Sequence, residues 1–327
     1  MRTRSFAAAG VALAALATSA TAGASADGVA AQNCVPKTNV EAIVDDSGSM
    51  LVTDSDRLRV RAMELFIDNP VNDKRTLGAL EFGTDAVRVF APTTISGNRA
   101  SMKSALDTAI QADNGLTDYN DAFSLAGTES PNATARIFLT DGQHNNEDSS
   151  PYANGHRGGP PVYVIGLNVV GDGDTVLQQI ASETGSLYRR ANDAGQLQSA
   201  MFDVNAAISC LARPITLQNT FTRQGQTQSR SVKLPTGVRS VNTALSWDDP
   251  NDAFDITGIR VIRKGKVVAR GSRVRKLRIT KRRGTTNVTV KIGRLVRGKL
   301  AFKLKATRLS GGGSAKLTTQ IVRSRNR

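Results

Sequence analysis

Residues 43–50, with the sequence IVDDSGSM, place two carboxylates and two serine hydroxyls directly after a short apolar run. Such a run predicts a buried strand, and functional side chains of α/β sheets gather where strands end. Three kinds of site would use this cluster: a serine nucleophile with its acid, a loop that cradles a phosphate, or part of a cage for a metal ion. Other segments of the chain must distinguish them.

Asp45, Ser47 and Ser49 are spaced two residues apart, so a single loop can aim their three oxygens at one point. Asp141 follows a second apolar segment, ARIFLT, and Thr117 opens a predicted helix. Hard cations such as Mg²⁺ prefer about six oxygen ligands and keep several waters. These five side chains therefore form a candidate cation site.

The elements that must position these side chains alternate between strand and helix, which favours a parallel sheet with helices on both faces. We predict this doubly wound, mostly parallel α/β fold, in which ligands bind beyond the carboxyl ends of the strands. The predicted strands are 39–44, 75–82, 86–90, 135–142, 161–169 and 186–191. The predicted helices are 56–69, with Asp56 as its N-cap, 99–110, 117–127, 175–185 and 194–210.

Asp45-x-Ser47-x-Ser49, followed by Thr117 and by Leu139-Thr140-Asp141-Gly142, resembles the metal ion-dependent adhesion site (MIDAS) of von Willebrand factor type A (vWA) domains. The resemblance covers roughly residues 39–210. It implies a Rossmann-like vWA fold, direct contact of the two serines and the threonine with a divalent cation, and a water-linked role for the two aspartates. The cation is expected to be Mg²⁺, with Mn²⁺ and Ca²⁺ as alternatives, and the partner a protein that offers an Asp or Glu carboxylate.

The chain departs from the commonest family pattern at two positions. It has Gly115-Leu116-Thr117-Asp118 where many members have Gly-Gly-Thr-Asn, and Asp46 adds a further carboxylate. If Asp46 or Asp118 faced the cation, the more negative site would favour Ca²⁺ and attract an acidic partner less strongly. We expect both carboxylates to point away.

The enzymatic alternatives have less support in the sequence. A serine nucleophile needs a positioned base, but the only histidines are His144 and His156, in a polar stretch that predicts a solvated loop. No G-x-S-x-G elbow and no phosphate-binding G-x-x-x-x-G-K-[ST] loop occur. We therefore expect a protein that is not an enzyme, and no catalytic residues are assigned.

The N-terminal residues predict export from the cytoplasm. Arg2 and Arg4 precede an Ala-rich apolar stretch and the cleavage-site pattern Ala24-Ser25-Ala26, so residues 1–26 are interpreted as a signal peptide. A membrane anchor is the alternative, but the apolar run is short for a span. No later segment is apolar enough to cross a bilayer. The predicted location is secreted, extracellular or associated with the cell surface.

The two cysteines are expected to pair in such an oxidising compartment. Cys34 lies in a short lead, residues 27–38, and Cys210 lies at the end of the predicted α/β domain, residues 39–210. Their disulfide would close that domain, a feature that also recurs in some extracellular vWA proteins. Two buried free thiols are the alternative.

The charge of the chain changes sign at the same boundary. Residues 27–210 contain 13 Lys and Arg against 24 Asp and Glu, a net charge of −11. Residues 211–327 contain 28 Lys and Arg against 4 Asp, a net charge of +24. Period-two alternation in the second segment, for example in VRSVNTALSW and KLAFKLKA, predicts a smaller all-β, sandwich-like domain.

A field of one sign predicts salt-sensitive attraction to polyanions such as an anionic cell-wall polymer or glycan. The densest basic stretch is RGSRVRKLRITKRRG, and few aromatic residues accompany it, so specific nucleic-acid binding is not expected. Alternatively, the positive charge of the basic domain serves to dock that domain on the acidic one. The predicted polyanion-binding residues are Arg273, Arg275, Lys276, Arg278, Lys281, Arg282 and Arg283.

These features support two functional hypotheses. The first is a secreted binding or adhesion protein that captures an acidic side chain through a metal ion. The second is a structural, envelope-associated protein whose metal site stabilises the fold and whose basic domain binds polyanions.

Overall fold

The structure is a computed structural model that places most of the chain after residue 33. It describes residues 34–146, 154–169, 171–211, 214–234, 236–270, 275–284, 286–293, 295, 297–311 and 313–323. The predicted signal peptide, Arg273 and the side chain of Arg275 lie outside the described residues. No described helix combines the length and the apolar character needed to cross a membrane.

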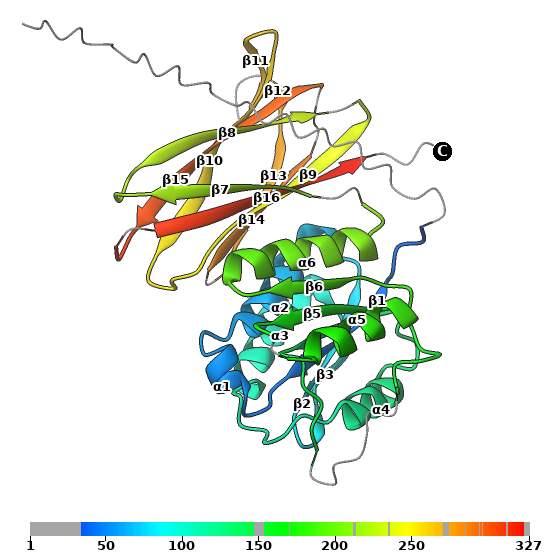
Figure 1. Cartoon of the computed structure of the whole chain (residues 1–327). Helices are drawn as coiled ribbons and strands as arrows, with labels where there is room; N and C mark the ends of the chain where they lie inside the picture. The colour runs from blue at the N-terminus through cyan, green and yellow to red at the C-terminus, as the bar shows by residue number, and fades with distance from the viewer. Residues whose placement is uncertain are drawn as a thin grey trace, which may run out of the picture.

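A six-stranded sheet forms the centre of the first domain, with the strand order β3-β2-β1-β4-β5-β6 (Figure 1). All neighbouring strands are parallel except β2 and β3, which form an antiparallel hairpin. The strands are β1 (Asn39–Asp45), β2 (Thr76–Phe82), β3 (Ala86–Thr94), β4 (Ala135–Thr140), β5 (Val162–Leu167) and β6 (Tyr188–Ala191). We call the unit from β1 to α6 the α/β domain.

Helices cover both faces of this sheet, as predicted. One core cluster joins the sheet to α2, α3 and α6, and a second joins its other face to α4 and α5. The helices are α1 (Met50–Thr53), α2 (Leu58–Asp68), α3 (Ile95–Ala109), α4 (Tyr119–Glu129), α5 (Gly173–Glu183) and α6 (Ala194–Ile208), with a 3₁₀ turn η1 (Pro70–Asn72). The strands β1, β4 and β5 are buried almost throughout because both faces are covered.

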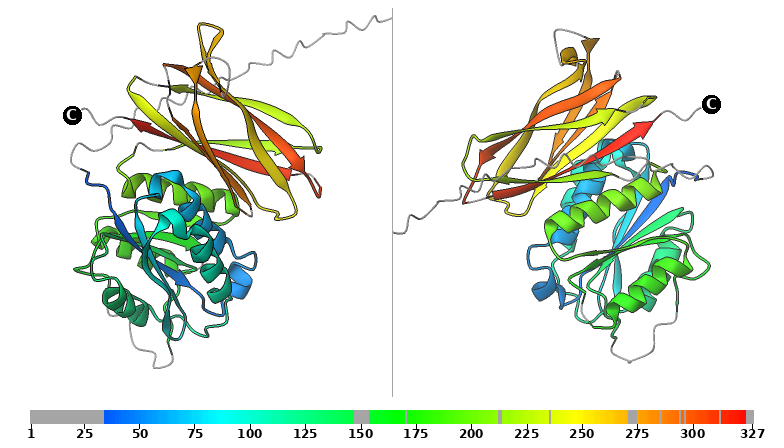
Figure 2. Two further views of the ribbon diagram at one scale, coloured as in Figure 1. Left: turned by 180° about the vertical axis from the view of Figure 1, so that it is seen from behind. Right: turned by 45° about the horizontal axis from the view of Figure 1, so that its top comes forward.

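The second unit, from β7 to β16, is an all-β domain built from two five-stranded sheets (Figures 1 and 2). We call it the β domain. Buried residues from both sheets, including Phe221, Leu245, Phe254 and Phe302, form a single core, so the sheets pack as a sandwich. One sheet contains β12 (Arg275–Lys276), β11 (Lys266–Arg270), β10 (Ala253–Arg263), β15 (Gly298–Arg308) and β8 (Thr227–Leu234) in that order. The other contains β13 (Arg278–Arg283), β14 (Asn287–Gly293), β9 (Val238–Trp247), β16 (Gly313–Arg323) and β7 (Ile215–Phe221).

The β domain docks on the α/β domain through the sheet that contains β9, β14 and β16, which lies against α6 and α2 (Figures 1 and 2). Arg282 forms an ion pair with Asp73 at 3.1 Å, and the hydroxyl of Thr289 donates to the carbonyl of Asp68 at 3.2 Å. Ala244 of β9 is part of the core cluster of the α/β domain. Part of the basic domain's charge is therefore used in docking.

The expected disulfide is present. Cys34 and Cys210 are bonded, with their Cα atoms 5.6 Å apart, and the described residues contain no free cysteine. The bond links the segment that leads into β1 to the residue just after α6. A backbone hydrogen bond from Lys37 to Ile208, at 2.9 Å, continues the same contact.

Two local predictions were wrong at helix starts, the N-cap at Asp56 and the opening of a helix at Thr117. The residue before α2 is Arg57 in a left-handed conformation, and the carboxylate of Asp54, not Asp56, accepts from the first backbone N–H groups. Helix α4 begins at Tyr119 with Asp118 as its N-cap, two residues after Thr117. In both places a carboxylate satisfies the free N–H groups of the first turn.

Candidate metal centre

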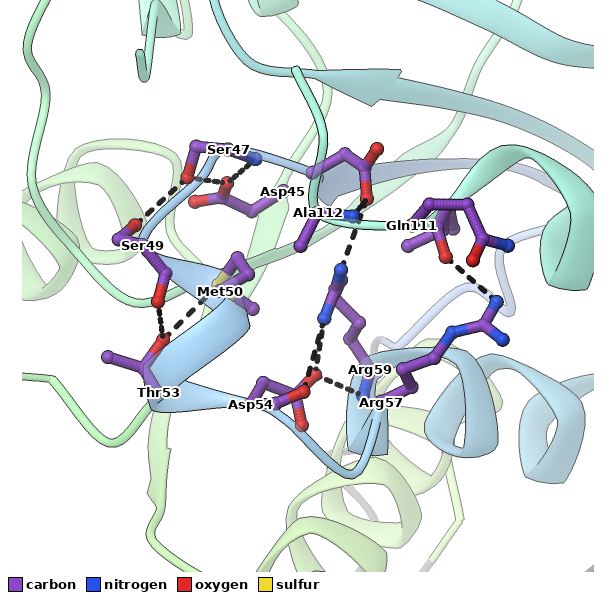
Figure 3. Close-up of polar contacts among 12 residues, drawn as sticks. Asp45, Ser47, Ser49, Met50, Thr53, Asp54, Arg57, Arg59, Gln111 and Ala112 are labelled. Atoms are coloured by element: carbon purple, nitrogen blue, oxygen red, sulfur yellow. Dashed lines mark hydrogen bonds and ion pairs between the residues drawn. The ribbon is translucent and has the colours of Figure 1, made fainter. Parts of the chain in front are cut away.

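Three oxygen-bearing side chains of the 43–50 segment contact one another at the end of β1 (Figure 3). Ser47 donates to Asp45 Oδ1 twice, from its backbone N–H at 2.9 Å and from its hydroxyl at 2.5 Å. The hydroxyl oxygens of Ser47 and Ser49 are 3.0 Å apart. Asp45 and Ser47 are buried, whereas Ser49 is exposed, so the cluster reaches the surface at Ser49.

Asp141 lies beside this cluster because β4 is the parallel neighbour of β1. It directly follows β4 and is buried. Its Oδ2 accepts a hydrogen bond from the hydroxyl of Thr53 at 2.9 Å, and the same hydroxyl lies 3.1 Å from the carbonyl of Ser49. The short helix α1 thus links Asp141 to the serine loop.

The loop that carries Thr117 contacts the serine loop through its backbone. The backbone N–H of Gly48 donates to the carbonyl of Gly115 at 2.8 Å, which joins that loop to the serine loop. Thr117 is buried and forms an isolated two-way backbone bridge with Asn145. Within the described part of the chain its hydroxyl makes no hydrogen bond.

The electrostatics of the site are unfavourable for protein atoms alone. Burial, and then the nearby charge of Asp141, raise the pKa of Asp45 to about 6, although hydrogen bonds from Ser47 and Thr140 act in the opposite direction. Among the described residues, no Lys, Arg or His forms an ion pair with Asp45 or Asp141. Two neighbouring buried carboxylates without a protein cation are an arrangement that a bound cation would stabilise.

The donor set fits a small hard cation. Two neighbouring ligands of an octahedral Mg²⁺, each about 2.1 Å from the ion, lie about 3 Å apart, and the hydroxyl oxygens of Ser47 and Ser49 are 3.0 Å apart. The described residues include no group of three or more His, Cys, Asp or Glu that could hold a metal. A cation here would therefore depend on hydroxyls and water as well as on two carboxylates, which suits Mg²⁺.

The two extra carboxylates point away from this cluster, as expected. Asp46 is fully buried, and its Oδ1 accepts from the guanidinium of Arg59 at 3.1 Å and from the backbone N–H of Ala112 at 2.6 Å. Asp118 Oδ1 accepts from the backbone N–H groups of Asn120 and Asp121. Both aspartates have structural hydrogen-bonding roles.

Sequence reasoning missed four residues that support the site. Thr140 donates to Asp45 Oδ2, Thr53 donates to Asp141, and Asn145 holds the backbone of Thr117. Arg59 is fully buried between Asp46 and Asp54. Its position in the sequence carried a signal, because residue 59 is in helical phase with the buried residues 62, 63 and 66.

The histidines do not complete a catalytic group with the serines. His156 was expected in a solvated loop, but it is fully buried, with Nε2 2.7 Å from Glu183 Oε2 and its ring against Phe123. His144 Nδ1 accepts from the backbone N–H of Tyr119 at 3.1 Å. In the described part of the chain, neither histidine bonds to Ser47 or Ser49.

Some residues of the predicted polyanion-binding stretch form ion pairs within the protein, and others are exposed. Lys281 and Arg283 pair with Asp255, and Arg282 pairs with Asp73 across the domain interface. Lys276 and Arg278 are exposed. The densest run of basic residues in the sequence is thus partly neutralised within the protein.

Comparisons with solved structures found the following similar chains. A solved structure described as von Willebrand factor type A from Catenulispora acidiphila is 15% identical, with 88% of this chain and 65% of that chain covered and a TM-score of 0.44. An aerotolerance-related membrane protein from Bacteroides fragilis NCTC 9343, with multiple mutations to serines, is 20% identical over 52% of this chain and 98% of its own, with a TM-score of 0.42. Proximal thread matrix protein 1 from the mussel byssus, with a zinc-occupied MIDAS motif, is 17% identical over 56% of this chain and 50% of its own, with a TM-score of 0.45. No curated protein matches the chain.

The family comparison concerns the α/β domain. The family model of the von Willebrand factor type A domain matches residues 39–203, which is half of the chain and includes all six strands of the first sheet. The match begins at the first residue of β1 and ends within α6. The chain therefore belongs to the von Willebrand factor type A domain family.

Proposed function

We propose that this chain is a secreted, non-enzymatic binding protein that captures an acidic side chain of a protein partner through a divalent cation, Mg²⁺ in the first instance. Ser47, Ser49 and Thr117 would hold the cation directly, and Asp45 and Asp141 would act through water. When bound, the cation supplies a positive charge that attracts a carboxylate.

The observation that carries this proposal is the hydrogen-bond pattern around Asp45. Its Oδ1 accepts from Ser47, and its Oδ2 accepts from Thr140. The hydroxyl proton of Ser47 is therefore directed toward Asp45, which leaves the lone pairs of the Ser47 oxygen for a cation. Asp45 therefore orients the hydroxyl of Ser47, and its negative charge favours a dication in the site. Because Asp45 would act through water, the dication would keep part of its positive charge for a partner.

The rim of the site adds a preference for the partner. Leu51 and Val52 of α1 are 62% and 86% exposed, and Leu116, next to Thr117, is 37% exposed. These are among the few large apolar side chains that the described residues expose. They favour a partner whose Asp or Glu is flanked by an aliphatic or aromatic side chain, because the apolar contact would add to the charge attraction.

The β domain has a separate role in the proposal. Its net charge of +24 over residues 211–327 favours retention near an anionic surface such as a cell-wall polymer. The α/β domain would then face its partner while the β domain holds the chain in place.

A metal that only stabilises the fold is the second candidate function, favoured by the burial of Asp45 and Asp141. The two functions differ in measurable ways. Stabilisation alone predicts that Mg²⁺ raises the melting temperature, with no carboxylate ligand bound at any metal concentration. Capture predicts that binding of an acidic peptide requires the metal.

Calorimetric titration with MgCl₂, MnCl₂ and CaCl₂ tests the metal site directly. We expect Ser47→Ala/Ser49→Ala to lower the metal affinity at least 10–100-fold. Asp113→Asn is the matched control, because Asp113 is an exposed acid that makes none of the site's contacts. Unchanged metal affinity in the double variant would refute the assignment.

A second titration uses the Mg²⁺-loaded protein and a peptide library that pairs Asp or Glu with leucine, phenylalanine or serine. We expect EDTA-sensitive binding of the apolar-flanked acidic peptides. The variant Val52→Ser should weaken those peptides and leave the metal affinity unchanged. Equal binding of amide-containing peptides would exclude carboxylate capture.

A further inference from the structure

The outer face of one sheet of the β domain concentrates cations that form no ion pair with a described acid. The acid Asp255 is opposite Lys305 in the strand register, but its ion pairs are with Lys281 and Arg283. Leu300, Phe302 and Leu304 of β15 point into the sandwich core, so the alternate residues of that strand face outward. Seven cations lie on the outward positions of β12, β11, β10, β15 and β8, and none has an ion pair among the described residues. They are Lys233, Arg260, Arg270, Lys276, Lys299, Lys303 and Lys305.

The strand register aligns three of these cations in one row. Arg260 of β10 is the direct partner of Arg270 of β11, and Arg270 is the partner of Lys276 of β12. Directly opposite like charges destabilise a sheet. Protection of a sheet edge explains a cation on β12, but Arg260 lies on an interior strand with neighbours on both sides.

A bulge in β10 opens a hollow beside the row. The pairing of β10 with β15 shifts between Thr257 and Arg260, and Gly258 has a φ of +58°. A Cβ at Gly258 would lie 3.4 Å from Lys303 Cγ and 3.6 Å from Arg260 Nη1, so Gly258 lies between two cationic side chains. Arg260 Nη1 also donates to the carbonyl of Gly258 at 3.2 Å. The hollow has a volume of about 440 Å³ and is lined on this sheet by Thr257, Gly258, Ile259, Arg260 and Arg270. Ile279 of β13, an edge strand of the other sheet, completes the lining, so the hollow lies at the border between the two sheets.

This face lies on the side of the sandwich away from the α/β domain, since the other sheet forms the domain interface (Figures 1 and 2). A ligand could therefore reach it without displacing α6 or α2. A second group of outward cations continues across β15 and β8, where Lys299 is paired with Lys233. With strands about 4.8 Å apart, cations occur over a width of roughly 20 Å across the five strands.

We propose that this outer face, centred on Arg260 and Arg270, binds a linear polyanion that carries repeated phosphate or sulfate groups. The paired guanidinium groups can each bind an oxyanion bidentately, and the cations on β15 and β8 would contact further groups of the same chain. A linear polymer matches cations spread over a flat face better than a lipid bilayer does, because a bilayer favours an apolar tip that can insert. The inference rests on the proposed attraction of the β domain to anionic surfaces. It keeps Arg270 and Lys276 of the basic stretch 270–284 and adds cations that strand register places on the same face.

The test measures binding of the full chain to size-defined polyphosphate and to heparin at several salt concentrations. The variant Arg260→Gln/Arg270→Gln removes the central pair. The control Arg263→Gln/Lys266→Gln removes another directly paired, exposed pair of cations from the same hairpin. Both variants lose the same net charge, and equal melting temperatures would confirm that both fold.

We expect the variant Arg260→Gln/Arg270→Gln to bind the polymers roughly tenfold or more weakly than wild type. Its slope of log K against log salt should be smaller by up to about 2. The control variant Arg263→Gln/Lys266→Gln should change the affinity less than threefold. EDTA should leave polymer binding unchanged. Equal losses in the two variants would overturn the assigned face while leaving net-charge attraction intact. No binding of either polymer by wild type would overturn the attraction itself, and binding only to vesicles that contain anionic lipid would assign the face to membranes instead.

Discussion

In the α/β domain, charged side chains such as Arg59, Asp46 and Glu41 are buried, whereas in the β domain cations such as Arg270 and Lys303 are exposed. Among the described residues of the β domain, Asp252 is the only buried charged side chain. Both domains are strongly charged, but a buried charge must be paired or hydrogen-bonded to be tolerated, while an exposed one is solvated by water. Substitution of charges should therefore affect stability in the first domain and ligand binding in the second.

The largest expected effect of this contrast is at Arg59. Its guanidinium lies 2.9 Å from Asp54 and 3.1 Å from Asp46, and all three side chains are buried. The variant Arg59→Met would leave two buried carboxylates unpaired, so we expect a loss of about 3–5 kcal/mol. The exposed counterpart Arg270→Met should change stability by less than about 0.5 kcal/mol.

Two signals separate the domains in this measurement. Far-UV circular dichroism at the helical minimum reports the α/β domain, since the described helices all belong to it. Fluorescence of Trp247, the only tryptophan of the chain, reports the core of the β domain. If Arg59→Met and Arg270→Met lost similar amounts of unfolding free energy in urea titrations, the contrast between the two domains would be refuted.

The disulfide gives the next effect. We expect Cys34→Ser/Cys210→Ser to destabilise the α/β domain by about 2–4 kcal/mol, because the closed loop restricts its unfolded state. The transition followed by Trp247 should move much less, since the bond lies outside the β domain. A larger shift in fluorescence than in circular dichroism would contradict this assignment.

Glu41 supplies a test with a defined pH dependence. Burial raises its pKa to about 7, although a hydrogen bond from Ser130 and the charge of Arg136 act in the opposite direction. The folded state therefore holds this proton more tightly than the unfolded state, whose carboxyl titrates near the ordinary value. The contribution of Glu41 to stability is greatest below about pH 4.5 and is lost as the pH rises toward 7.

The matching variant is Glu41→Gln, which is uncharged at every pH. We expect it to be more stable than wild type by roughly 1–3 kcal/mol at pH 8 and to differ less at pH 4.5. Unfolding free energies of both proteins at the two pH values give the comparison. A pH-independent difference would show that Glu41 has the same pKa in the folded and unfolded states and would contradict the raised pKa.

The smallest effect is expected at the domain interface. Arg282 and Asp73 are partly exposed, with side chains 21% and 34% accessible, so solvent screening limits their pair to about 0.5–1 kcal/mol. A double-mutant cycle of Arg282→Met and Asp73→Asn measures the coupling. In each single variant, the unfolding transitions followed by circular dichroism and by fluorescence should differ more in their midpoints than in wild type. A coupling near zero would mean that apolar contacts, such as those of Ala244, hold the domains together.

The first sheet and its site could be predicted because both depend on local patterns. Apolar runs located β1 and β4, and parallel pairing places the ends of neighbouring strands at one edge, where Asp45 and Asp141 meet. The hydroxyl spacing of Ser47 and Ser49 completed the pattern. Period-two alternation likewise located β9 and β15.

Features that depend on tertiary contacts could not be predicted from local sequence patterns. Composition showed that the second domain is basic, but the cation row on Arg260 and Arg270 follows from strand register and from a bulge at Gly258. The polar sequence around His156 predicted exposure, and its burial depends on packing against Phe123 and on Glu183. Pairing of Arg282 with Asp73 joins residues 209 positions apart.

The position of the disulfide has a mechanical consequence. Cys34 and Cys210 lie at the two ends of the α/β domain, and their covalent bond joins the segment before the domain directly to the segment after it. Tension applied between residues that precede Cys34 and the β domain would pass through the sulfur atoms. The loop between the cysteines, which are 176 positions apart in the sequence, would carry none of that load. The site at Asp45 would thus keep its geometry while the chain is pulled, and reduction of one bond would expose the whole domain to the force.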